Sequence, residues 1–97
     1  MENEMSTDKP KRKRITFQLV TEPGSKVSIA GSFNNWEPET TPLNDKNGNG
    51  TYTRSMLLAP GRYEYKFVID GVWCVDPECR EWVPNSQGSL NSVIQVG

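Results

Sequence analysis

Hydrophobic and polar residues alternate along residues 60–73, PGRYEYKFVIDGVW. Successive side chains of an extended strand point to opposite faces, so Tyr63, Tyr65, Phe67 and Ile69 share one face. The pattern predicts a strand whose aromatic face lies in the core. The opposite face then carries Glu64, Lys66, Val68 and Asp70.

Turn signals bound this strand on both sides. Pro60-Gly61 precedes it, and this pair favours a chain reversal because proline presets φ and glycine accepts a positive φ. Asp70-Gly71 follows it and is a strong two-residue hairpin signal. The second turn delivers Trp73 to the start of a partner strand, and a large aromatic side chain beside a turn is a candidate binding platform.

Shorter segments of the same kind lie on both sides. Residues 15–20, 27–33, 52–58 and 92–96 alternate in the same way and are separated by Gly, Pro and Asn. Residues 74–88 are rich in turn formers and predict a long irregular connection with one short strand. Because no stretch has helical periodicity, the sequence predicts an all-β sandwich of about seven strands.

Two of these segments leave a choice about their inward side. In residues 52–58, the inward face combines Tyr52, Met56 and Leu58 with Arg54 as an awkward polar member. In residues 92–96, the core side is formed either by Ile94 and Val96 or by Val93.

Residues 45–50, DKNGNG, have the carboxylate and amide spacing of the first half of a calcium loop. A full EF-hand loop starting at Asp45 needs a glutamate at its twelfth position, where Met56 stands, and it needs flanking helices. The neighbouring segments are β-rich. We therefore interpret this stretch as a hairpin turn, since turns demand the same residue types.

The composition describes one small domain. The chain has 97 residues, of which 34% are hydrophobic and 24% charged. It has no long apolar run and no secretory signal, which predicts a cytoplasmic protein without membrane contact. Cys74 and Cys79 are then expected as reduced thiols, and no second cysteine pair completes a zinc site.

The net charge of −1 conceals an asymmetry. Residues 1–14 carry five basic and three acidic side chains, so the rest of the chain has six basic and nine acidic ones. We predict a disordered basic tail over residues 1–14 and a folded domain over residues 15–97. A nucleic-acid-binding arm is the less favoured reading of the tail, since no aromatic residue interleaves its charges and the body is acidic.

Catalytic chemistry has little support in this sequence. The chain has no histidine, which removes imidazole acid–base catalysis and the common metal sites. The Gly-Ser pairs lack a base partner, and no phosphate-binding glycine loop is present. We predict a protein that is not an enzyme and uses no cofactor or metal.

Three tryptophans, at positions 36, 73 and 82, lie in loops or at turns. They either cap the core or form a ligand platform. A flat indole matches the C–H face of a pyranose ring, while nearby amides and a lysine bond the hydroxyl groups. This combination suits a neutral polyol.

Three blocks of sequence together resemble a known family. They are GSFNNW at residues 31–36, residues 60–73 with Asp76-Pro77 after them, and GSLNSVIQV at residues 88–96. In this order and spacing they resemble the glycogen-binding domain of the AMP-activated protein kinase β subunit and related early-set modules of glycogen branching and debranching enzymes. The resemblance covers residues 15–97. It implies an immunoglobulin-like, early-set β-sandwich without catalytic residues that binds α-1,4-linked glucan.

The resemblance also implies a set of carbohydrate-binding residues. Trp36 and Trp73 fall on the two tryptophans that stack on glucose units. Lys66 and Asn91 fall on residues that bond sugar hydroxyls, and Ser89 keeps the hydroxyl of a family threonine. These assignments predict a glycogen-, starch- or maltooligosaccharide-binding site.

One position departs from the family pattern. Gln87 stands where a leucine enters the curve of the glucan, and the loop before it is longer and carries Trp82, an alternative source of the missing apolar contact. The expected ligand is an α-glucan polysaccharide or oligosaccharide bound by a monomer, with a glycan-metabolising enzyme as a further partner. The rival hypothesis is a protein-interaction module that docks on such an enzyme or on a kinase without binding sugar.

Overall fold

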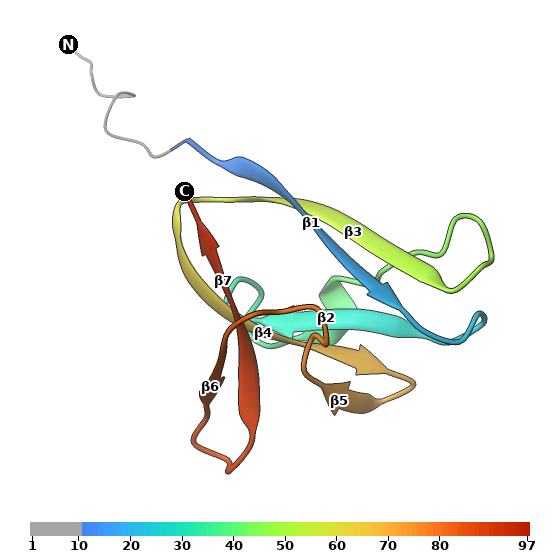
Figure 1. Ribbon diagram of the computed structural model, residues 1–97. Helices are drawn as coiled ribbons and strands as arrows, with labels where there is room; N and C mark the ends of the chain where they lie inside the picture. The colour runs from blue at the N-terminus through green and yellow to red at the C-terminus, as the bar shows by residue number, and fades with distance from the viewer. Residues whose placement is uncertain (1–10) are drawn as a thin grey trace.

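The computed structural model describes residues 11–97, which fold into two antiparallel β-sheets (Figure 1). Strands β1 (Lys13–Val20) and β3 (Thr51–Leu58) form the smaller sheet. The larger sheet has the order β2 (Val27–Gly31), β4 (Gly61–Ile69), β7 (Leu90–Val96) and β6 (Trp82–Pro84), with β5 (Val72–Cys74) also paired to β4. The predicted all-β sandwich of seven strands is confirmed. Within residues 11–97, no helix has the length and apolar character to cross a membrane.

Several element boundaries differ from the sequence expectation. Strand β1 begins at Lys13, two residues inside the range expected as a tail, because its ladder with β3 extends to a pairing of Lys13 with Leu58. Residues 11–12 of the expected tail belong to no helix or strand, and residues 1–10 lie outside the described residues. Strand β2 ends at Gly31, two residues earlier than expected. The expected short strand within residues 74–88 is confirmed as β6.

The core lies between the two sheets. Tyr65 and Phe67 are buried on the inner face of β4, as the alternation predicted, and Tyr63 and Ile69 pack against the same cluster from its margin. The core cluster consists of Phe17, Leu19, Val27, Ile29, Leu43, Tyr52, Leu58, Tyr65, Phe67 and Val96.

The choices left open by the sequence are resolved by this core. In β7, Val96 belongs to the core cluster and Ile94 packs against it, whereas Val93 is buried on the opposite face. In β3, Met56 packs against the core. Arg54 pairs with a core residue of β1, but its guanidinium reaches out and donates from Nη1 to the carbonyl of Pro42 at 3.2 Å.

Strand β4 is the centre of the larger sheet. One of its edges pairs with β2 over residues 65–69. Its other edge is shared, because β7 pairs with residues 61–65 and β5 pairs with residues 67–69. Lys66 lies at the single position between these two ladders. The sheet therefore has a gap on one side of β4, bounded by an end of β7 and by β5.

The loop at residues 45–50 is a turn, as the sequence indicated. Asn44 and Thr53 exchange two backbone hydrogen bonds across its base, at 3.0 and 2.9 Å. The Asp45 carboxylate accepts hydrogen bonds from the backbone N–H groups of Asn49 and Gly50, at 3.1 and 2.7 Å. The carboxylate thus stabilises the turn through hydrogen bonds to its own backbone. Residues 11–97 contain no cluster of three or more acidic, cysteine or histidine side chains suited to a metal ion.

A buried polar network anchors the connection between β5 and β6. The Tyr65 hydroxyl donates to Asp76 Oδ2 at 2.7 Å, and the backbone N–H of Asp76 donates to Ser92 Oγ at 2.8 Å. The other carboxylate oxygen of Asp76 accepts the N–H of Glu78 at 2.9 Å. The network links β4 and β7 to the segment that runs from Trp73 toward β6, and so it fixes where this segment crosses the sheet.

Tyr65→Phe should destabilise the domain, because it leaves a buried carboxylate oxygen without its donor. The expected loss in the free energy of unfolding is about 1–3 kcal/mol. At ~4–8 °C per kcal/mol for a domain of this size, thermal unfolding will show the change clearly. Tyr63→Phe is the matched control on the same strand, because the Tyr63 hydroxyl donates to a neutral backbone carbonyl, that of Ala59. Equal losses in the two variants would contradict a special role for Asp76.

The stability advantage of wild type over Tyr65→Phe should depend on pH in alkaline solution. Burial raises the pKa of the Tyr65 phenol far above its usual range, and the hydrogen bond to Asp76 adds to the effect. A tyrosine in the unfolded chain ionises near pH ~10. The contribution of the Tyr65 hydroxyl to the free energy of unfolding is therefore fully present below that pH and is lost as the pH rises further. The stability difference between wild type and Tyr65→Phe should narrow above about pH 10, as measured by urea unfolding.

Candidate functional site

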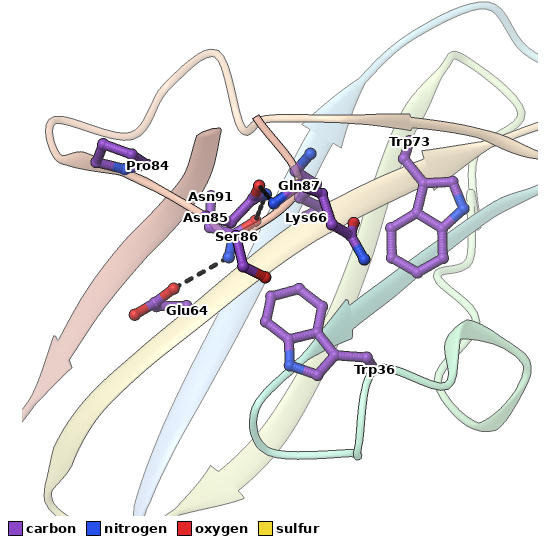
Figure 2. Close-up of a pocket in the computed structure, with 9 residues that line it drawn as sticks. All are labelled: Trp36, Glu64, Lys66, Trp73, Pro84, Asn85, Ser86, Gln87 and Asn91. Carbon is purple, nitrogen blue, oxygen red and sulfur yellow. Dashed lines mark hydrogen bonds between the residues drawn. The ribbon is translucent and has the colours of Figure 1, made fainter. Parts of the chain in front are cut away.

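A surface cleft of about 730 Å³ opens on the outer face of the larger sheet, beside the gap in the edge of β4 (Figure 2). Three regions of the chain border it: the loop after β2, the strands β4 and β5, and the segment from β6 to β7. Its lining consists of Trp36, Glu64, Lys66, Trp73, Pro84, Asn85, Ser86, Gln87 and Asn91.

Strand pairing explains why residues distant in sequence meet here. Cross-strand partners in an antiparallel ladder share one face of the sheet. Trp73 pairs with Val68, and Asn91 lies two residues along β7 from Val93, the partner of Glu64, so both side chains lie on the outer face with Lys66. This crowded face also buries Val68, which the alternation alone placed on a polar side.

Trp36 reaches the cleft from a tight loop with an unusual backbone. Asn35 and Trp36 both have a left-handed conformation, with φ of 57° and 61°. A bulky residue rarely adopts this region, and the cost is of order 1–3 kcal/mol. Such strain is typical of functional positions, and it persists only where the surrounding structure holds it in place.

Asn34 supplies that support. Its Oδ1 accepts the backbone N–H of Gly31 at 2.9 Å, and its Nδ2 lies 3.1 Å from both the carbonyl of Ile29 and the hydroxyl of Thr41. The N–H of Trp36 donates to the carbonyl of Gly31 at 2.9 Å. A Cβ atom at Gly31 would lie only 2.7 Å from the carbonyl oxygen of Glu64, so the loop also requires glycine there.

The opposite wall of the cleft is the turn between β6 and β7. Asn85 Oδ1 accepts the backbone N–H groups of Gln87 and Ser89, at 2.9 and 3.1 Å. Lys66 Nζ donates to the Ser89 hydroxyl, which ties this turn to β4. In Figure 2 the Gln87 side chain extends toward the space between the two indoles.

Five of the residues expected to bind carbohydrate are brought together in the cleft: Trp36, Lys66, Trp73, Gln87 and Asn91. Ser89 lies next to them, since Lys66 bonds its hydroxyl. Trp82 is not part of the lining. It pairs with Ser92, a fully buried residue whose neighbour Tyr65 faces the core, so Trp82 points to the other side of the sheet.

Four lining residues were missed by the sequence reasoning. Glu64 could have been found from the sequence, because residues two positions apart in a strand share a face and Glu64 is two positions from Lys66 in β4. Asn85, Pro84 and Ser86 carried none, since only the folded turn shows which way they face.

Glu64 and Lys66 are the titratable side chains that line the cleft, whereas Cys74 lies on the opposite face of β5 from Trp73 and packs against the core. Glu64 Oε2 accepts from Arg62 Nη1 at 3.3 Å, so its carboxylate is engaged in an ion pair. Burial raises the pKa of the Cys74 thiol, the nearby Asp76 carboxylate adds to the rise, and the Lys66 ammonium opposes it. A raised pKa keeps this thiol protonated and weakly nucleophilic. Cys74 and Cys79 are both free thiols, as expected.

Comparison with known proteins gives the site its context. The sequence pattern of the family described as "Glycogen recognition site of AMP-activated protein kinase" matches residues 14–97. This chain belongs to that family. The match includes every residue of the cleft, from the loop of Trp36 to Asn91 in β7.

Individual members and relatives are similar along most of this chain. The cattle 5'-AMP-activated protein kinase subunit beta-1 is 38% identical over 94 residues, which is 96% of this chain and 33% of that protein. The rice chloroplastic protein FLOURY ENDOSPERM 6 is 36% identical over 83 residues, covering 86% of this chain and 15% of the relative. The Arabidopsis chloroplastic protein PTST homolog 2 is 45% identical over 53 residues, covering 55% of this chain and 10% of the relative. The chain thus spans a third or less of the length of these relatives.

Asn34→Ala should disrupt the cleft although Asn34 does not line it. The substitution removes the hydrogen bonds that hold the strained loop, at a cost of about 2–3 kcal/mol. We expect a lower melting temperature and, well below that temperature, a changed fluorescence of Trp36.

Asn35→Gly is the control for this prediction. Glycine adopts a positive φ without strain, so this neighbouring variant should keep the loop and the wild-type fluorescence. An Asn34→Ala protein with the stability and fluorescence of wild type would refute the anchoring role of the Asn34 amide.

Proposed function

We propose that this domain binds α-1,4-linked glucan without catalysing a reaction. Trp36 and Trp73 serve as stacking platforms, and Lys66, Ser89 and Asn91 bond sugar hydroxyls. Gln87 lies at the concave side of the bound glucan. The observation that carries the proposal is the meeting of two solvent-accessible indoles with amide, hydroxyl and ammonium groups in one cleft of a glycogen-recognition fold.

The chemistry of the cleft fits a neutral polyol. An indole face covers the C–H groups of a pyranose, and the polar groups around it offer both donors and acceptors. The strained, braced loop of Trp36 holds one platform rigid before ligand arrives, which lowers the entropic cost of binding. The Glu64 carboxylate in the lining is engaged in an ion pair with Arg62, in keeping with a binding role.

The affinity for short oligosaccharides should be modest. If each indole and sugar face removes about 100 Å² from water, each platform contributes roughly 2.5 kcal/mol at ~25 cal/mol/Å². Loss of rigid-body freedom offsets much of this gain. Dissociation constants of about 0.1–1 mM are therefore expected, since 1 mM corresponds to about −4 kcal/mol.

The rival hypothesis, docking on an enzyme without sugar, has no better support. Relatives of this chain include subunits of a protein kinase, which favours an enzyme as an additional partner. The other expectations stay predictions: a monomer, no nucleic acid or membrane partner, and a location in the cytoplasm, although two relatives are named as chloroplastic.

Trp36→Ala and Trp73→Ala should each abolish measurable binding of maltoheptaose in calorimetry while the cooperative unfolding transition persists. The matched control is Trp82→Ala, because Trp82 and Trp73 are almost equally exposed, at 43% and 45%, but Trp82 faces away from the cleft. Wild-type affinity in either platform variant would sink the proposal. Loss of cooperative unfolding would instead place that tryptophan in the core.

Gln87→Leu should tighten the binding of β-cyclodextrin by about tenfold, or 1.4 kcal/mol. Leucine presents apolar surface to the concave side of the ring, and it loses less rotamer entropy than glutamine when it is held still. Binding of linear maltose should hardly change. If Gln87→Leu leaves cyclodextrin affinity unaltered and Trp82→Ala destroys it, Trp82 supplies the apolar contact and the assignment of Gln87 is wrong.

A further inference from the structure

One side chain that the family resemblance does not assign contacts three of the proposed ligand-binding residues. Asn85 Oδ1 accepts the backbone N–H groups of Gln87 and Ser89. Its Nδ2 donates to Asn91 Oδ1 at 3.0 Å. Asn85 thus shapes the turn that carries two of these residues and contacts the amide of the third.

The direction of every amide in this network is determined from both ends. Backbone N–H groups only donate, so the oxygen of Asn85 must face the turn and its nitrogen must face Asn91. At the other end, Asn91 Nδ2 donates to Glu64 Oε1 at 3.0 Å, and a carboxylate only accepts. Arg62 holds the second oxygen of Glu64. The carbonyl of Asn91 therefore faces Asn85, and its NH₂ group faces Glu64.

We propose that Asn85 is a positioning residue, which sets the direction in which Asn91 presents its amide to the hydroxyl groups of a glucan. This inference rests on the proposed function. Asn91 is only 6% exposed, so its amide cannot turn freely to suit a ligand. Its remaining N–H and its remaining lone pair are offered in fixed directions, and a site held in this way loses less entropy when ligand binds.

Asn85→Asp tests the polarity of the network while it keeps the shape of the turn. Aspartate retains the oxygen that accepts from Gln87 and Ser89 but replaces the donor facing Asn91 with a second acceptor. With carboxylates on both sides, either orientation of the Asn91 amide places an oxygen against an oxygen. We expect maltoheptaose to bind about tenfold more weakly, as measured by an NMR titration, with only a small change in melting temperature.

Asn91→Ala provides the background that separates positioning from a general effect of added charge. If Asn85 acts through Asn91, Asn85→Asp should weaken binding by less than about twofold once Asn91 has been replaced. An added negative charge that simply disfavoured the ligand would act equally in both backgrounds. A tenfold loss that persists with Asn91→Ala, or wild-type affinity in Asn85→Asp, overturns the inference.

Glu64→Leu approaches the network from its other end and serves if Asn85→Asp does not fold. It removes the acceptor of the Asn91 amide, so its effect on maltoheptaose affinity should also be smaller in the Asn91→Ala background. An equal loss of affinity in both backgrounds counts against the inference. The wild type distinguishes the two levels of failure. If wild type binds maltoheptaose and the couplings are absent, the positioning role alone is wrong, whereas a wild type that binds no glucan refutes the proposed function and the inference with it.

Discussion

The shared edge of β4 is the constraint on which the site depends. A strand in a sheet ordinarily has one neighbour on each side, but β4 pairs with β7 along its first half and with β5 along its last residues. The change of partner occurs at Lys66. Because β5 and β7 approach from opposite ends, they bring Trp73 and Asn91 to the two margins of the same gap. The core packing of Tyr65 and Phe67 on the other face of β4 keeps this arrangement in register.

Rigidity in the cleft comes from side-chain amides and not from the strands alone. Asn34 braces the loop of Trp36, and Asn85 braces the turn of Gln87 and Ser89. In each case one carboxamide satisfies backbone groups that the tight loop leaves without strand partners. The left-handed backbone of Trp36 fits this reading, because strain of this kind persists where the surrounding contacts hold a functional side chain in a fixed position.

The sequence predicted most of the fold because its signals were local. Alternation identified β4 and its inner face, and the Asp70-Gly71 pair placed Trp73 in a partner strand. The resemblance to the glycogen-binding family singled out Trp36, Lys66, Gln87, Ser89 and Asn91, which the structure gathers at one place.

What the sequence left undetermined depends on contacts between distant segments. Whether Val93 or Val96 faces the core follows from the ladder with β4, and the direction of Trp82 follows from its pairing with Ser92. Neither ladder has a local signature. The place of Asn85 could not be predicted for the same reason, since an asparagine in a turn reads as a turn former until its partner in β7 is known.

The most direct test of the account is a titration of the ¹⁵N-labelled domain with maltoheptaose, followed by amide chemical shifts. Glucan bound between Trp36 and Trp73 should cause saturable shifts confined to the rim of the cleft: residues 34–37, 64–66, 72–74 and 84–91. Shifts centred instead on the opposite side of the sheet, around Trp82 and Cys79, or a spectrum that stays unchanged at millimolar sugar, would contradict it.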